Sequence, residues 1–180
     1  MTYNTSSKIA GRDGLNYPTS NIFVQQIEIT NGPPLTDLSS VPPAGRILAL
    51  DPGTKRVGVA VCDELRITTR PLERITRESW KKLLTAVKNI VAELDAVALV
   101  IGLPLESDGT ESPMSAEARD MARKFELSLS IPVFLQDERV TSYEAKSRLW
   151  GRGVDPRDAR EMVDSEAASI ILSDFLSRIQ

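Results

Sequence analysis

The fold is decided by Ile47-Leu48-Ala49-Leu50-Asp51-Pro52-Gly53-Thr54-Lys55-Arg56-Val57-Gly58-Val59-Ala60-Val61-Cys62. Its first apolar run, 47–50, is typical of a buried strand, and Asp51-Pro52-Gly53 ends that run with turn residues. A second apolar run, 57–62, follows, and only five residues separate Asp51 from its first residue, Val57. The two runs are therefore predicted to pair as an antiparallel hairpin, with an aspartate at the end of its first strand.

Downstream of the hairpin, the pattern changes to alternating helices and strands. A third strand is expected at 66–69, ended by Pro71. The apolar spacing from Trp80 to Leu94 predicts a long helix, with Thr76 as its cap. Further elements are expected as a strand at 96–101, a loop at 103–112, a helix around 118–125, a strand at 133–135, and helices at 142–150 and about 162–179, the last preceded by the cap-like pair Asp155-Pro156. This order predicts an α/β domain with a mixed five-stranded sheet of order 3-2-1-4-5 and helices on both faces.

Composition narrows the possible functions. The chain of 180 residues is long enough for one substantial domain, and its net charge of −3 gives no global basic field. It has no histidine and one cysteine, which excludes imidazole-based triads, histidine-ligated zinc and an internal disulfide. No run of roughly 18 apolar residues and no secretory signal occur, so a cytoplasmic location without membrane contact is expected.

The first 44 residues differ from the rest of the chain. They are enriched in Ser, Pro, Asn and Gly, which is typical of a disordered extension. The segment 22–29 is the one piece with the apolar content of an edge strand or short helix. The predicted organisation is an extension over 1–44 and one domain over 45–180.

Acidic residues from three parts of the chain are expected at one edge of the sheet. Asp51 follows the first strand, Asp137 and Glu138 follow the fifth, and Asp164 lies near the start of the last helix on its apolar stripe. Sites in such sheets form beyond the carboxyl ends of the parallel strands, and clustered carboxylates suit hard divalent cations. Each acid also has a structural interpretation: a turn residue for Asp51, a solvated loop for Asp137-Glu138, and a helix cap for Asp164.

Residues beside these acids are candidates for binding phosphate. Gly53, Thr54, Lys55 and Arg56 combine backbone amides, a hydroxyl and two cations next to Asp51. The alternative is that Gly53 only serves the tight hairpin. Arg139 and Thr141 follow Glu138 in a similar way.

Four segments together resemble the YqgF/RuvX family, the pre-16S rRNA nucleases related to Holliday-junction resolvases. They are Asp51 to Ala60, Val100 to Pro104 with Asp108-Gly109-Thr110, Asp137 to Ser142, and Asp164 to Ala168. Their order and their spread over about 46–176 make the resemblance specific. It implies a ribonuclease-H-like fold and a hydrolase that cleaves phosphodiester bonds with Mg²⁺ or Mn²⁺.

The positions that match the family's motifs imply that the catalytic and metal-binding acids are Asp51, Glu138 and Asp164, with Asp137 as the alternative to Glu138. The implied substrate is nucleic acid, namely the 5′ end of precursor 16S rRNA or structured DNA, with ribosomal particles as further partners. The alternatives are a Holliday-junction resolvase, a non-catalytic RNA-binding or ribosome-binding factor, and an ATP-binding domain of the actin-like class. The last needs two such domains, whereas this chain supplies one. The sequence leaves the oligomeric state open.

Strand geometry helps to choose between Asp137 and Glu138 as the metal-binding acid. In related nucleases an acid ends the fourth strand, but here Gly102 occupies that place. Adjacent side chains on a strand point to opposite faces, so only one of the two acids is expected to face Asp51. Glutamate reaches one methylene further than aspartate, which favours Glu138.

Overall fold

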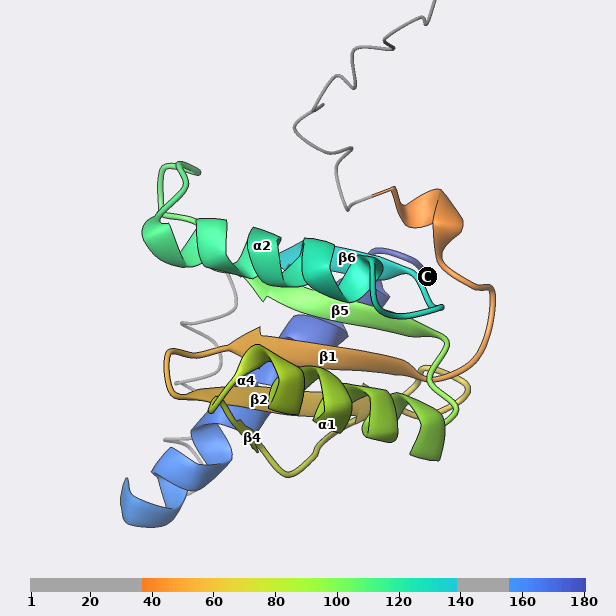
Figure 1. Cartoon of the computed structure of the whole chain (residues 1–180). Coiled ribbons are helices and arrows are strands. Elements are labelled where there is room, and N and C mark those ends of the chain that lie inside the picture. Colours follow the sequence, from red (N-terminus) through yellow and green to blue (C-terminus); the bar gives the residue numbers. More distant parts are fainter. Residues whose placement is uncertain (1–36, 139–155) are drawn as a thin grey trace, which may run out of the picture. The chain divides into compact units, whose positions relative to one another are not determined.

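The computed structural model describes residues 37–138 and 156–180, with side chains in the second range from Ser165 onward. Its core is a mixed sheet in which the strands run in the order β3-β2-β1-β5-β6 (Figure 1). The bounds are β1 Ile47–Pro52, β2 Arg56–Cys62, β3 Thr69–Pro71, β4 Ile75–Thr76, β5 Ala98–Leu103 and β6 Val133–Asp137. β5 and β6 are the fourth and fifth predicted strands, so the predicted order 3-2-1-4-5 is confirmed.

Strand pairing follows the predicted hairpin and crossovers. β1 and β2 are antiparallel with Leu50 opposite Val59, whereas β1 pairs with β5, and β5 with β6, in parallel. The sequence did not predict β4, a two-residue strand that pairs with the first residues of β2. It is too short to show an alternating pattern, and only its pairing defines it.

The predicted third strand at 66–69 is displaced. Arg66 has a φ of 60°, in the left-handed region, so the chain is still turning there. The Asp63 carboxylate holds this turn by accepting hydrogen bonds from the amides of Ile67 (3.2 Å) and Thr68 (2.6 Å). The strand therefore begins only at Thr69 and includes Pro71, which an edge strand tolerates.

In the described ranges, the α-helices that flank the sheet are α1 Trp80–Glu93, α2 Pro113–Glu126 and α4 Pro156–Ser177. The cap of α1 is Ser79, whose hydroxyl accepts from the amide of Lys82, and not Thr76 as predicted. Thr76 lies in β4 opposite Arg56. The last helix begins at Pro156, the proline of the predicted cap-like pair, so the predicted start near 162 is about six residues too late. The helix predicted at 142–150 lies outside the described residues.

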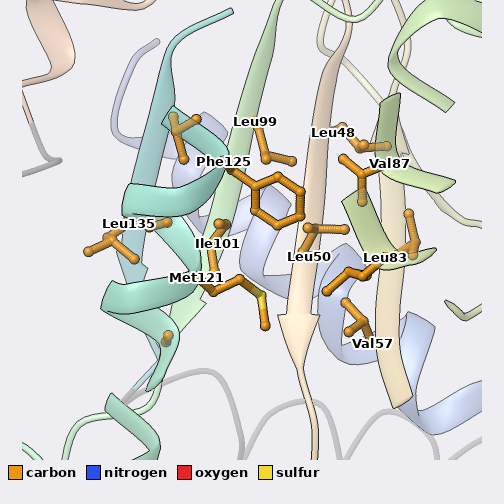
Figure 2. Close-up of a cluster of buried hydrophobic side chains, with 14 of the residues drawn as sticks. Leu48, Leu50, Val57, Leu83, Val87, Leu99, Ile101, Met121, Phe125 and Leu135 are labelled. Carbon is orange, nitrogen blue, oxygen red and sulfur yellow. The ribbon is translucent and has the colours of Figure 1, made fainter. Parts of the chain in front are cut away.

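The sheet is covered on both faces, and each face has its own apolar cluster. Alternation along the strands sends Leu48, Leu50, Leu99 and Ile101 toward α1 and α2 (Figure 2). The intervening residues pack against α4, as a second cluster that includes Ile47, Ala49, Ala98, Val100, Phe134 and Phe175. Within the described ranges, no helix combines the length and apolarity needed to cross a membrane.

Residues 37–44, at the end of the predicted extension, contact the domain. A short 3-10 helix, Leu38–Ser40, precedes Val41, and both Leu38 and Val41 pack against the α4-side cluster. The Arg66 guanidinium donates to the carbonyls of Pro42 (2.6 Å) and Gly45 (3.0 Å). Residues 1–36 lie outside the described part, so the boundary at residue 44 remains a prediction.

A chain that begins at Gly45 is expected to unfold at a lower temperature than one that begins at Asp37. It loses the apolar contacts of Leu38 and Val41 and the bond from Arg66 to Pro42, together worth about 1–2 kcal/mol. At this size the loss corresponds to a few degrees. Thermal unfolding of the two chains tests this. Leu38→Ala with Val41→Ala in the longer chain should reproduce most of the difference, and equal melting temperatures would contradict the packing role.

Candidate active site

The carboxyl ends of three neighbouring strands meet at one edge of the sheet. β1 ends with Asp51 and Pro52, and β6 ends with Asp137. β5 lies between them and ends with Gly102 and Leu103. Because all three strands run in the same direction, their last residues lie at the edge where sites form in open α/β sheets.

Asp51 is part of the sheet and not of the turn that follows it. It pairs with Gly58 of β2 in the antiparallel ladder, so its interpretation as a turn residue is wrong. Leu50 packs on the side of α1 and α2, and Ala49 on the side of α4. By alternation, Asp51 faces the α4 side, where the residue opposite it on β2 has no side chain.

Gly102 leaves a space that the carboxylate of Glu138 fills. A Cβ at Gly102 would overlap Oε1 of Glu138 and would lie 2.8 Å from its Cδ and 2.8 Å from Cδ1 of Ile171 on α4. The backbone amide of Glu138 donates to the carbonyl of Leu103 (3.2 Å), which holds the chain beside β5 after β6 has ended. One more step of the β1–β5 register, which pairs Leu50 with Ile101, brings Gly102 beside Asp51. Glu138 therefore reaches back over β5 toward Asp51.

The environment of Glu138 is unfavourable for an ionised carboxylate. Its Oε1 is buried and accepts no hydrogen bond within the described part of the chain. Burial, followed by the negative charges of Asp51 and Asp137, raises the pKa of the Glu138 carboxyl to about 8. The solvated-loop interpretation is thus wrong for Glu138. A buried, repelled carboxylate of this kind is what a cation would stabilise.

Asp164 lies inside α4, eight residues after Pro156. It therefore cannot cap a helix that begins at Ser165, and that interpretation is wrong. It is seven residues before Ile171, whose side chain reaches the space at Gly102. The side chain of Asp164 lies outside the described residues. Where side chains are described, no three acidic, histidine or cysteine groups form a cation site by themselves.

The loop between β1 and β2 holds the predicted phosphate-binding residues. Thr54, Lys55 and Arg56 are exposed at the same sheet edge. A Cβ on Gly53 would lie 2.7 Å from the carbonyl oxygen of Arg56, so the tight turn requires glycine there. The structural interpretation of Gly53 is therefore correct, and a phosphate-binding role is compatible with it. Arg139 and Thr141 lie outside the described residues.

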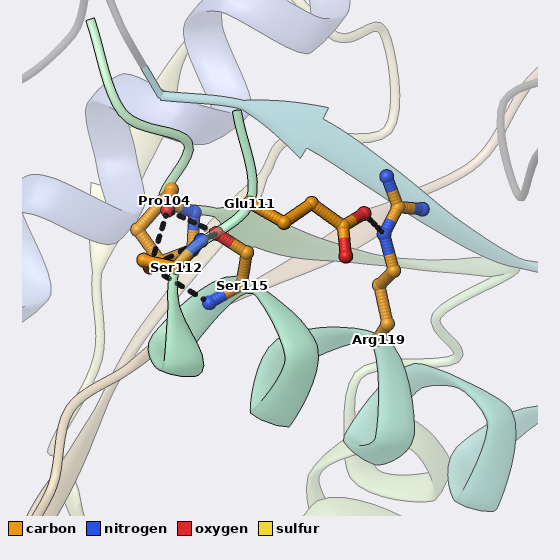
Figure 3. A network of polar contacts seen from close by, with 5 residues as sticks. All are labelled: Pro104, Glu111, Ser112, Ser115 and Arg119. Atoms are coloured by element: carbon orange, nitrogen blue, oxygen red, sulfur yellow. Dashed lines mark hydrogen bonds and ion pairs between the residues drawn. The ribbon is translucent and has the colours of Figure 1, made fainter. Parts of the chain in front are cut away.

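The loop after β5 holds the start of α2 through the carbonyl of Pro104 and through Ser112. The carbonyl of Pro104 accepts from the hydroxyls of Ser115 (2.5 Å) and Ser112 (3.3 Å), and these serines form a reciprocal cap at the start of the helix (Figure 3). Asp108 accepts from the amide (2.9 Å) and hydroxyl (2.7 Å) of Thr110. The bonds of Ser112 and Ser115 to Pro104 therefore fix the start of α2 beside the end of β5, whereas those of Asp108 hold a turn within the loop.

Residues 45–178 match the model of the family described as "RuvX: Holliday junction resolvase". The chain belongs to the RuvX family. A relative from Anaeromyxobacter dehalogenans (strain 2CP-C) is 43% identical over 74% of this chain and 97% of the relative. One from Syntrophus aciditrophicus (strain SB) is also 43% identical, over 74% of this chain and 89% of the relative. Both are named provisionally as pre-16S rRNA nucleases.

Among solved structures, T. thermophilus RuvC in complex with Holliday junction substrate aligns over 75% of this chain and 96% of that chain, with 13% identity and a TM-score of 0.48. The resemblance that the sequence motifs carry is confirmed by the RuvX family model and by these relatives. Membership classes the domain as a hydrolase of phosphodiester bonds.

Sequence reasoning missed two features of this RuvX-family site. The sequence showed that Gly102 stands where related nucleases have an acid. It did not show that this glycine leaves space for the Glu138 carboxylate. Sequence reasoning also passed over Gln136, a polar residue near the end of β6 that is only 6% exposed. Its amide nitrogen donates to the carbonyl of Asp137 (3.2 Å), and its oxygen accepts from Arg178 (2.9 Å). Gln136 thus ties the end of β6 to the residue that follows α4.

In metal-free protein, Glu138→Gln is expected to stabilise the fold above neutral pH. A carboxyl with a pKa near 8 when folded and 4.5 when unfolded binds more protons in the folded state between these values. Stability from this group is complete below about pH 4.5 and is lost as the pH rises to about 8. The uncharged glutamine escapes this loss, so the difference should grow by about 1.4 kcal/mol per pH unit, to a few kcal/mol at pH 8.

Denaturant unfolding with a chelator at pH 5 and pH 8 measures this difference. Other titrating groups, such as Asp63, occur in both proteins and cancel in the comparison. A difference that does not change with pH would mean that the Glu138 carboxylate is solvated or paired in the folded protein. Added Mg²⁺ should reverse the order by stabilising the wild type more than the variant.

Proposed function

We propose that this domain is a divalent-metal-dependent nuclease that matures the 5′ end of pre-16S rRNA during ribosome biogenesis. The observation that carries the proposal is the buried Oε1 of Glu138, which accepts no hydrogen bond from the residues described and faces the charge of Asp51. The names of the relatives support the choice of substrate. Precursor rRNA in the cytoplasm, free or in ribosomal particles, is then the partner.

Asp51, Glu138 and Asp164 would hold the cation, with Asp137 as the alternative to Glu138. The residues present fit Mg²⁺ or Mn²⁺, because carboxylate oxygens are the donors that hard cations prefer. A cation would also neutralise the repulsion that raises the pKa of Glu138. When bound, it supplies positive charge that stabilises the phosphodiester group during cleavage.

The β1–β2 loop would bind the substrate backbone beside these acids. The hydroxyl of Thr54 and the charges of Lys55 and Arg56 are exposed there. Lysine and arginine bind phosphate oxygens through charge-assisted hydrogen bonds, and arginine does so with two donors at once. Arg139 and Thr141 follow Glu138 in the chain and are proposed for the same role. The cations compensate locally for a chain whose net charge is −3.

A Holliday-junction resolvase is the second candidate, because the family model carries that description. A four-way DNA junction and a folded rRNA precursor both present closely spaced phosphates to the same residues. The acids and the exposed loop serve either substrate equally. The two functions therefore differ in the nucleic acid and not in the proposed chemistry.

Asp51→Asn is expected to lower cleavage of a precursor 16S fragment by at least about a hundredfold, since it removes a metal-binding charge with almost no change of shape. The folded, metal-free variant should be at least as stable as wild type, because repulsion with Glu138 falls. The measurement is cleavage with Mg²⁺ or Mn²⁺, with a chelated sample as control.

A synthetic four-way junction is assayed under the same conditions. Faster cleavage of the junction than of the precursor fragment would favour the resolvase. Activity of Asp51→Asn within a few-fold of wild type would contradict the metal site itself.

The position of the Glu138 carboxylate over Gly102 should be as important as its charge. Glu138→Gln and Gly102→Ala are both expected to abolish cleavage, the second because its methyl group displaces the carboxylate. Gly102→Ala should still fold, since the overlapping atom ends a flexible side chain. Asp137→Asn should remain active and lose stability instead. Cleavage rates and thermal unfolding of the three variants test this.

The added methyl group also approaches Cδ1 of Ile171, so Gly102→Ala with Ile171→Val serves as the matched control. This double variant removes the contact with α4 and keeps the overlap with Glu138, and it should stay inactive. Recovery of activity in it would assign the defect to helix packing. An inactive Asp137→Asn with an active Glu138→Gln would reverse the assignment of the two acids.

A further inference from the structure

Arg77 contacts both ends of the loop between β1 and β2. Its Nη1 donates to the carbonyl of Gly53 (2.9 Å), and its backbone amide donates to the carbonyl of Lys55 (3.0 Å). These two carbonyls flank Thr54, the exposed tip of the loop. A single residue, remote in sequence, therefore fixes the backbone on each side of the proposed phosphate-binding residues.

Two neighbouring elements bring Arg77 to this position. β4 pairs with β2 through Thr76 opposite Arg56, so the next residue of the chain comes beside Lys55. On its other side, Nη2 of Arg77 forms an ion pair with Glu117 of α2. The guanidinium is planar and rigid, so an anchor at Glu117 also orients the donor that binds Gly53. The Arg77 side chain is 22% exposed, which limits competition from water.

A pocket lies beside the loop between β1 and β2. Its volume is about 290 Å³, and Thr54 and Arg77 line it together with Ser79, Trp80, Glu117 and Lys124. Because space remains beside Thr54, loss of the Arg77 guanidinium would leave the Gly53 end of the loop free to move into it, while the backbone bond to Lys55 would remain. The hydrogen bonds of Arg77 therefore hold the loop on this side.

We propose that Arg77 is a positioning residue that holds the β1–β2 loop in the conformation that receives a substrate phosphate. The proposal rests on the proposed nuclease function. Arg77 acts through the loop and not on the reacting atoms. Its ion pair with Glu117 makes α2 the support for this part of the site.

Cleavage kinetics of Arg77→Ala test the functional part. If the loop must be ordered when substrate binds, the substrate complex is weaker. KM should therefore rise about tenfold, which is the effect of losing one charge-assisted hydrogen bond. The value of kcat should stay within about threefold of wild type. Arg77→Lys keeps one donor and should recover part of the loss. Partial unfolding would instead lower kcat in proportion to the inactive fraction.

Arg119→Ala is the matched control. Arg119 forms an ion pair with Glu111 at the start of the same helix and has a comparable exposed fraction of 34% (Figure 3). No described contact joins it to the β1–β2 loop. Arg119→Ala should leave KM unchanged, and Glu117→Gln should raise KM less than Arg77→Ala does.

Amide hydrogen exchange provides a measurement that does not depend on activity. Peptides that cover 51–56 should exchange faster in Arg77→Ala than in wild type or Arg119→Ala, with the rest of the domain unchanged. Faster exchange in a protein whose wild type is inactive would support the loop contact and contradict the proposed nuclease function. Unchanged exchange, or a KM equal to that of Arg119→Ala, would overturn the role of Arg77.

Discussion

The candidate site is organised around a buried carboxylate oxygen that accepts no hydrogen bond from any residue that the structure describes. Oε1 of Glu138 is buried in the space that Gly102 leaves, with the charges of Asp51 and Asp137 nearby. Burying a charge is costly unless it is paired, and repulsion adds to the cost. A protein keeps such a group only where a function or a ligand compensates for it. In this domain the compensation would be a divalent cation.

The sheet supplies the conditions for this arrangement. Both faces of β1, β5 and β6 are apolar along most of their length, so polar side chains appear only where the strands end. Alternation sends Asp51 to the α4 side, and the glycines at 58 and 102 leave its neighbouring positions on the sheet without side chains. The acids can therefore approach each other across an intervening strand, which larger residues would prevent.

The same edge is held by backbone anchors on either side of the acids. The carbonyl of Pro104 is fixed by the cap of α2, and the carbonyls of Gly53 and Lys55 are fixed by Arg77. α2 takes part in both, through Ser115 and Glu117. One helix on the opposite face of the sheet thus supports the two loops that border the candidate site. Because these loops are already held in place, substrate binding would lose less free energy to ordering them.

The sequence by itself determined the order of the strands, the hairpin that carries Asp51 and the proline start of the last helix, because periodicity and turn chemistry are local. Its motifs also identified the family. Only the tertiary structure decided that Glu138 occupies the space above Gly102, that Ser79 and not Thr76 caps α1, and that β4 brings Arg77 to the hairpin. These features depend on which segments meet across the sheet. No local sequence pattern indicates that Gly102 leaves space for the side chain of Glu138, which lies 36 positions further along the chain.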